Sequence, residues 1–169
     1  KVAVAEERYL GGTCVNVGCV PKKMMWNAAH FADELTIAGD YGFPLTPPVF
    51  DWACFKTARD TFIERLNGIY LRNLESSNVD TYRGWAVFES VKNVRVGDQV
   101  LTADHVLIAT GGRPATLNLP GADLAITSDG FFELKSQPKN PLIIGAGYIA
   151  TELAGVLQSL GSNVTMLLR

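Results

Sequence analysis

"PLIIGAGYIATELAGVLQSLGSNVTMLLR", residues 141–169, decides the fold class of this chain. The stretch reads as a short apolar strand, a helix that ends at Gly161, and a second apolar strand. Two strands joined by a helix form a βαβ unit, which is typical of a parallel α/β sheet. Because this pattern begins at Asn140, we expect a new domain to cover residues 138–169.

The turn between the first strand and the helix contains Gly145-x-Gly147-x-x-Ala150. Glycines in this context permit a tight turn and the close approach of a pyrophosphate to the helix N-terminus, so we predict a dinucleotide site. The residue at the end of the second strand selects the cofactor. Arg169 suits the 2′-phosphate of NADP, whereas an acidic residue would suit NAD. An ordinary exposed arginine at a strand end is the alternative.

Residues 1–137 are expected to form another α/β unit. Apolar periodicity predicts a helix over residues 14–36, with Pro21 bending or breaking it, and a second helix that starts at an Asp51 N-cap. Strands are predicted at residues 2–5 and in three consecutive runs, 78–90, 93–103 and 105–110, with a tight hairpin turn at Gly97-Asp98.

Two of the three cysteines lie close together in "GGTCVNVGCVPKK", residues 11–23. Residues five apart in a regular helix have Cα atoms roughly 8.6 Å apart, but a disulfide needs about 4.4–6.8 Å. Cys14 and Cys19 can therefore bridge only if the turn is distorted, which Gly18 and Pro21 both permit. A distorted bridge near a helix N-terminus favours a redox pair, because the helix end favours a thiolate. A metal site and an inert buried pair are the alternatives.

The other cysteine and the bulk composition exclude several classes of function. Cys54 lies within an apolar helical seam and is expected to be a small core residue. Neither it nor the two histidines has the spacing of a metal site, so no metal is predicted. A net charge of −2 gives no reason to expect nucleic acid as a partner, and the apolar runs are too short to span a membrane. We expect an internal part of a longer cytoplasmic protein.

Taken together, the cysteine motif, "ATGGRP" at 109–114 and "GAGYIATELAG" at 145–155 resemble the pyridine nucleotide–disulfide oxidoreductases over the whole chain. The resemblance implies a Rossmann-like FAD/NAD(P)-binding two-domain disulfide reductase fold, here partial. An antiparallel β-meander would be inserted in it. Residues 1–137 would be the C-terminal part of the FAD domain, and residues 138–169 the start of the NADPH domain.

The resemblance also implies roles around FAD. Glu6 matches the glutamate on the adenosine ribose, and Thr13 and Cys14 would line the flavin. Lys22 matches the lysine beside flavin N5, and Glu152 matches its ion-pair partner near the nicotinamide. Further FAD contacts would come from Ala86, Thr110 and Gly111.

Cys14 resembles the thiol that attacks the substrate disulfide, and Cys19 resembles the thiol that forms a charge-transfer complex with the flavin. Tyr148 resembles the aromatic gate over the flavin, and Tyr70 matches a tyrosine at a glutathione site. The residues expected to bind NADPH are Gly145, Ala146, Gly147, Tyr148, Ile149, Glu152 and Arg169.

Within the family, the chain is most similar to the enzymes that reduce oxidised glutathione with NADPH. Mercuric and dihydrolipoamide enzymes tend to have Ser-Lys in place of Lys22-Lys23, and "ERLNGIY" at 64–70 argues against the trypanothione type, although Phe62 departs from some relatives. Such enzymes are homodimers whose C-terminal domain supplies a His-Glu acid/base pair. Neither His30 nor His105 has that context. An inactive truncated chain without a complete cofactor site is a further alternative.

Overall fold

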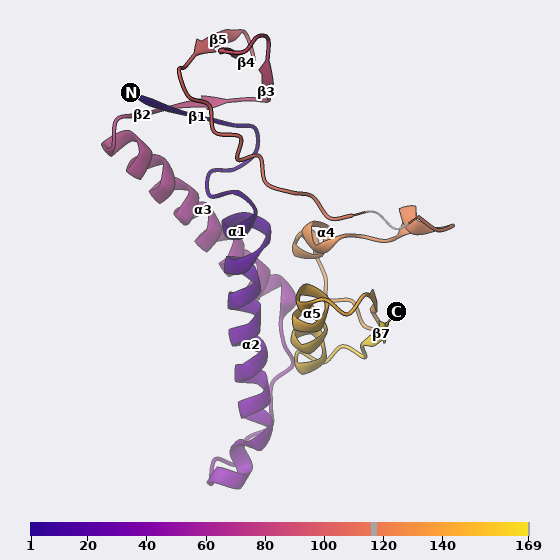
Figure 1. Cartoon of the computed structure of the whole chain (residues 1–169). Helices are drawn as coiled ribbons and strands as arrows, with labels where there is room; N and C mark the ends of the chain where they lie inside the picture. The colour runs from indigo at the N-terminus through magenta and orange to yellow at the C-terminus, as the bar shows by residue number, and fades with distance from the viewer. Residues whose placement is uncertain (116–117, 169) are drawn as a thin grey trace.

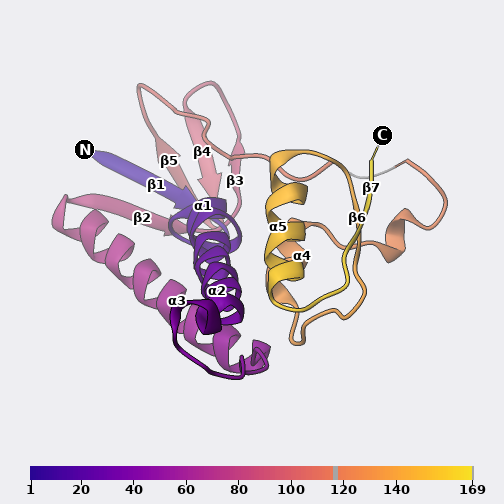
Figure 2. The same ribbon diagram turned by 90° about the horizontal axis from the view of Figure 1, so that it is seen from below.

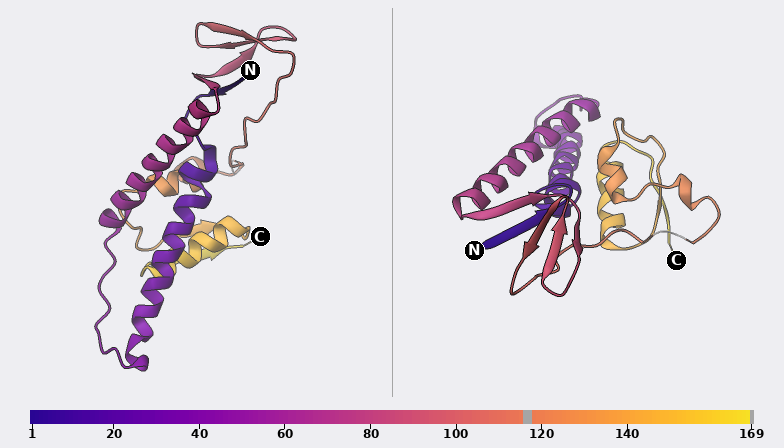
Figure 3. Two further views of the ribbon diagram at one scale, coloured as in Figure 1. Left: turned by 90° about the vertical axis from the view of Figure 1, so that its left-hand side faces the viewer. Right: turned by 90° about the horizontal axis from the view of Figure 1, so that it is seen from above.

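The computed structural model of the protein describes residues 1–115 and 118–168. Its two long helices, α2 (Cys19–Ile37) and α3 (Trp52–Ser76), contact each other and run at an angle to each other (Figure 1). The small sheets near the N-terminus and the segment 38–50 lie at opposite ends of α2 (Figure 3). Within the described ranges, no helix combines the length and the apolarity needed to cross a membrane.

The helix predicted over residues 14–36 is two helices. The short helix α1 (Gly12–Val17) ends at Gly18, and α2 begins at Cys19. The predicted break at Pro21 is therefore wrong by three residues. Pro21 lies in the first turn of α2, where the N–H that proline lacks would have no intrahelical partner.

Helix α3 begins as predicted. The Asp51 carboxylate accepts a hydrogen bond of 2.9 Å from the backbone N–H of Cys54, which is an N-cap. However, Cys54 is exposed, so its predicted place in the core is wrong. It follows the buried Trp52 by two residues, and two residues turn a helix by about 200°, which places Cys54 on the opposite face.

The N-terminal half contains two small sheets. Strand β1 (Val2–Glu6) pairs in parallel with β2 (Val79–Arg83), with Val2 opposite Val79. Strands β3 (Ala86–Phe88), β4 (Asn93–Val96) and β5 (Gln99–Thr102) form an antiparallel sheet in the order β3-β4-β5. The predicted β-meander is thus confirmed, and Gly97 makes its hairpin turn with φ +58°. The single strand predicted over residues 78–90 is wrong, because Gly84, with φ +149°, lies between β2 and β3, which belong to different sheets.

The third predicted strand, residues 105–110, is wrong. This segment is irregular, and Leu107 and Ile108 are 88% and 69% exposed. A strand needs hydrogen bonds to a neighbour, and no strand of the described chain pairs with this segment. The apolar composition of this segment suits a buried strand, but the segment has no neighbouring strand to form hydrogen bonds with among the described residues.

The C-terminal unit is the βαβ that the sequence predicted. Strands β6 (Leu142–Ile144) and β7 (Thr165–Leu167) pair in parallel, and α5 (Tyr148–Ser159) connects them. Figure 2 shows α5 between α2 and this two-stranded sheet. A short helix that the sequence did not predict, α4 (Ser128–Glu133), precedes the unit. Two 3-10 turns, η1 (Ala38–Tyr41) and η2 (Ala122–Leu124), lie in loops.

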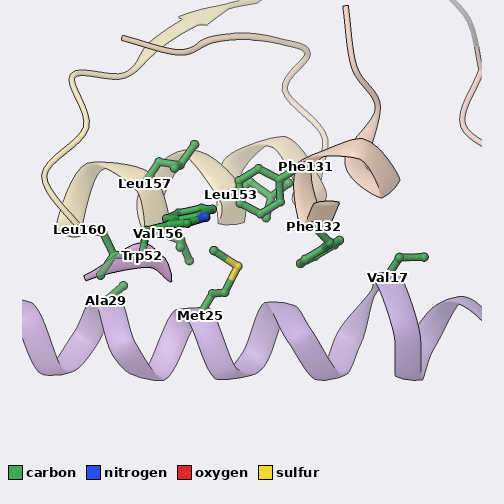
Figure 4. Close-up of a cluster of buried hydrophobic side chains, with 10 residues drawn as sticks. All are labelled: Val17, Met25, Ala29, Trp52, Phe131, Phe132, Leu153, Val156, Leu157 and Leu160. Carbon is green, nitrogen blue, oxygen red and sulfur yellow. The ribbon is translucent and has the colours of Figure 1, made fainter. Parts of the chain in front are cut away.

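One apolar core joins these parts. Side chains of α1 and α2 point toward those of α4 and α5, with Trp52 at the start of α3 between them (Figure 4). The core residues are Val17, Met25, Ala29, Trp52, Phe131, Phe132, Leu153, Val156, Leu157 and Leu160. The core spans both sides of residue 138, and the predicted domain boundary there stays a prediction.

A buried guanidinium lies at the edge of this core. Arg59 is 2% exposed, and its Nη2 donates hydrogen bonds to the carbonyl oxygen of Phe132 at 2.6 Å and to Asp60 at 2.7 Å. Lys56 also donates to Asp60, at 2.5 Å. Burial alone raises the pKa of Asp60, but the hydrogen bonds from Lys56 and Arg59, together with their charges, outweigh it. The net effect is a lowered pKa.

The lowered pKa of Asp60 predicts an acid-sensitive contribution to stability. A carboxylate whose folded pKa is depressed stabilises the fold above its unfolded pKa of about 3.9, and the contribution is lost as the pH falls through the lower folded value. We therefore expect Asp60→Asn to lose more stability at pH near 7 than under strongly acidic conditions. Urea unfolding of both proteins at each pH measures this. A loss independent of pH would contradict the assignment.

Candidate active site

The cysteine pair lies at the junction of two helices. Cys14 belongs to α1, and Cys19 is the first residue of α2. Both are free thiols and both are exposed. Gly18 between the helices has φ −150° and ψ −120°, so the chain is not helical there. The distorted turn that a bridge would require is thus present.

The two thiols interact in this reduced form. A hydrogen bond with Cys19, the partial burial of the thiol and the charge of Cys19 together raise the pKa of Cys14. Two thiols that influence each other in this way lie close together, which is compatible with their oxidation to a disulfide.

Gly18 permits this arrangement because it has no side chain. A Cβ atom at this position would lie 2.7 Å from the carbonyl oxygen of Thr13, and the backbone would have to move to accept it. The glycine therefore allows the end of α1 to fold back closely on its own backbone.

We expect Gly18→Ala to lower the free energy of unfolding by about 1–3 kcal/mol, the usual cost of overpacking a closed contact. It should also separate the two thiols and slow their oxidation to a disulfide. Gly39→Ala is the matched control, because a Cβ there meets nothing within 4 Å. Urea unfolding and the rate of disulfide formation in air measure both effects. Equal behaviour of the two variants would contradict this role of Gly18.

A cation is held one turn after Cys19. The Lys22 ammonium, on α2, donates to the Glu152 carboxylate, on α5, at 2.5 Å. Their side chains are 26% and 37% exposed, so the ion pair is only partly screened by water. This pair joins residues that are 130 positions apart, and it places a fixed positive charge on the helix that begins at Cys19.

The N-terminus of α5 has the features of an anion site. Gly145 has φ +125°, a conformation that favours glycine, and Gly147 is the N-cap of the helix. No side chain caps this helix, and its first turn has no acidic residue. The first backbone N–H groups of α5 therefore have no intrahelical acceptor and no side-chain cap, which suits a phosphate group.

The other predicted site residues are spread over the fold. Glu6 ends β1 and accepts a hydrogen bond from the N–H of Arg8, and Ala86 begins β3. Tyr148 and Tyr70 are exposed, on α5 and α3. Thr13 lies on α1. Ala146 lies in the turn before α5, and Ile149 lies in the first turn of α5. Thr110 and Gly111 lie in the irregular segment after β5. Arg169 lies outside the described residues. The roles of all these residues stay predictions.

The histidines and the remaining cysteine do not join the site. His30 is a surface residue that stacks on Trp26, with its Nε2 atom 3.3 Å from a carboxylate oxygen of Glu34. His105 is exposed too. In the part of the chain that the structure describes, no three His, Cys, Asp or Glu side chains gather as a metal site would require.

Sequence reasoning missed Asn16, which lies inside the cysteine motif, and its partner Asn67. The side chain of Asn16 accepts a hydrogen bond from Asn67 of α3 at 3.0 Å and donates to the loop before α1. The signal was in the sequence, since Asn16 is a polar residue between two buried valines in the middle of the cysteine motif.

Comparisons with known proteins place the chain in a family. The chain is 45% identical over 183 residues to the glutathione reductase of Yarrowia lipolytica and 49% identical over 178 residues to that of Schizosaccharomyces pombe. Each match covers all of this chain but only 39% and 38% of the relatives. The model of the pyridine nucleotide-disulphide oxidoreductase family matches residues 1–169. The chain therefore belongs to the pyridine nucleotide-disulphide oxidoreductase family.

Proposed function

We propose that this chain is the part of an FAD- and NADPH-dependent reductase that carries the redox-active cysteine pair, and that the protein reduces oxidised glutathione. The observation that carries the proposal is that Cys14 and Cys19 lie on the two sides of a helix break, one turn before Lys22. The names of two relatives that are 45% and 49% identical support glutathione as the substrate.

The residues present fit the two nucleotides. The uncapped N-terminus of α5 and the glycines before it suit the pyrophosphate of NADPH, with Tyr148 exposed at the same place. Glu6 and Thr13 are proposed to hold FAD near the cysteine pair. When bound, FAD and NADPH supply the hydride chemistry that no side chain performs. Lys22, kept in place by Glu152, would stabilise negative charge beside the pair.

The cysteines then carry the disulfide chemistry. Two electrons and two protons convert the Cys14–Cys19 disulfide into two thiols. The thiolate of Cys14 attacks one sulfur of oxidised glutathione, forms a mixed disulfide and releases one glutathione thiolate, which takes a proton. The thiolate of Cys19 then attacks Cys14, releases the second glutathione and restores the internal disulfide. A thiol is mostly protonated near neutral pH, so a base must take the proton of Cys14 before the attack, and the raised pKa of Cys14 increases this need.

The experiment that tests this function is a substrate panel with the full-length protein. We expect NADPH to be oxidised rapidly with oxidised glutathione and slowly with trypanothione disulfide, lipoamide or Hg²⁺, and NADH to be a poor donor. Turnover with lipoamide and NADH, or with trypanothione disulfide alone, would move the assignment to that branch of the family. No turnover with any of them would favour an inactive chain.

We also propose that the full-length protein is a cytoplasmic homodimer. The cytosol keeps thiols reduced and suits a cysteine pair that must cycle. The exposed apolar side chains between Ile37 and Val49, with Tyr41 75% and Phe43 67% exposed, support a protein partner at that end of α2. Light scattering on the purified protein and cell fractionation test the two proposals.

A further inference from the structure

Asn16, which lies between the two cysteines in the sequence, has a side-chain amide that ties α1, the helix of Cys14, to its surroundings. Asn16, on α1, donates hydrogen bonds through Nδ2 to the carbonyl oxygens of Gly12, at 2.8 Å, and Leu10, at 3.3 Å. Both acceptors lie at or before the start of α1. The side chain therefore holds the helix to the loop that precedes it.

A second amide fixes the first. Asn67, on α3, donates through Nδ2 to the Oδ1 atom of Asn16 at 3.0 Å. With two hydrogens donated and its oxygen accepting, the carboxamide of Asn16 is held in one orientation. Both residues are half-buried, so water competes with these bonds only in part.

Helix α1 needs such support because it is short. It has six residues, it begins after Gly11 without a side-chain cap, and it ends at Gly18. A helix of this length is not stable by itself. Val15 and Val17 are buried, Val17 in the apolar core, and Asn16 adds directional bonds. A rotation of α1 would move Cys14 relative to Cys19, because Cys19 belongs to α2.

We propose that Asn16 and Asn67 are positioning residues that hold Cys14 against Cys19 and so set the reduction potential of their disulfide. The inference rests on the proposed function, in which this pair cycles between disulfide and dithiol. Two thiols held close together lose little freedom when they form a disulfide, so the disulfide is favoured. When the hydrogen bonds between these side chains are removed, Cys14 moves more freely, and the redox equilibrium shifts toward the dithiol.

The test measures the redox equilibrium of the pair in the full-length protein. The reaction is the exchange of one Cys14–Cys19 disulfide and two reduced glutathiones for a dithiol and one oxidised glutathione. The protein is equilibrated in buffers of varied glutathione ratio without NADPH, quenched with acid and alkylated, and the mass of the cysteine peptide gives the oxidised fraction. The variants are Asn67→Ala and the isosteric Asn67→Asp, whose carboxylate has no hydrogen to donate to Asn16.

Asn73→Ala is the matched control, since Asn73 is an exposed asparagine on the same helix. We expect both Asn67 variants to favour the dithiol by about three- to tenfold, the effect of one hydrogen bond, and the control to match the wild type. Thermal unfolding verifies that the variants are folded, and Asn67→Asp keeps the shape of the side chain if Asn67→Ala does not fold.

An unchanged equilibrium in folded Asn67 variants would overturn the positioning role and leave the proposed function intact. A wild-type pair that stays reduced at every glutathione ratio would overturn both the proposed function and this inference. A shift of the same size in the Asn73 control would also overturn the inference, because the effect would then belong to the helix and not to the amide.

Discussion

Replacing Cys19 by serine is expected to reduce the proposed NADPH-dependent disulfide reductase activity of the full-length protein by at least about a thousandfold, as for other residues that act as one catalytic unit. A serine at this position cannot form the internal disulfide, so the pair has no oxidised form for the cofactor to reduce. It also cannot attack the mixed disulfide on Cys14, so the first turnover leaves glutathione bound. The consumption of NADPH in the presence of oxidised glutathione measures the loss.

Cys54→Ser is the control for this experiment. Cys54 is an exposed thiol on α3 and lies outside the pair, so its replacement should leave the activity unchanged. Mass analysis adds a second readout, since the Cys19→Ser protein should retain one glutathione per chain on Cys14 after exposure to oxidised glutathione. A Cys19→Ser variant as active as Cys54→Ser would exclude the proposed pair as the redox centre.

Local patterns in the sequence predicted the elements whose causes are local. The strand, helix and strand of residues 142–167 follow from apolar runs and from the glycines between them, and the Asp51 cap follows from one side chain and one N–H three residues on. The break between α1 and α2 lies at Gly18 and not at the predicted Pro21, because no local sequence pattern marks it. Only in the folded chain does the carbonyl oxygen of Thr13 lie so close to Gly18 that a Cβ atom there would clash with it.

Elements that depend on distant partners were predicted poorly. Residues 105–110 have the composition of a strand, but a strand also requires a neighbour. The site divides in the same way. Lys22 and Glu152 are 130 residues apart, and only the resemblance to a family paired them, while the bond of Asn67 to Asn16, over 51 residues, was not foreseen. Arg59 reads as an ordinary surface charge until Phe132, 73 residues further on, covers it.

The burial of Arg59 leads to the largest expected effect on stability. Arg59→Ala should lower the free energy of unfolding by about 3–5 kcal/mol, the range for breaking a buried charged contact. The change removes the donor to the Phe132 carbonyl, leaves Asp60 with Lys56 alone, and opens a cavity beside Met25, which is fully buried.

Urea unfolding followed by tryptophan fluorescence measures this effect close to its origin. Trp52 is 6% exposed and contacts Phe131 edge to face, with ring centroids 6.1 Å apart, so its emission reports on the core beside Arg59. Arg65→Ala is the control, because Arg65 is exposed on the same helix, and its loss should cost about 0.5 kcal/mol or less. Arg59→Met keeps most of the volume and loses the hydrogen bonds, so it should fall between the two. Equal losses in Arg59→Ala and Arg65→Ala would mean that the core tolerates an open Phe132 carbonyl. The link from α3 to the end of α4 would then rest on apolar packing and on the hydrogen bond from Trp52 Nε1 to the carbonyl oxygen of Leu134.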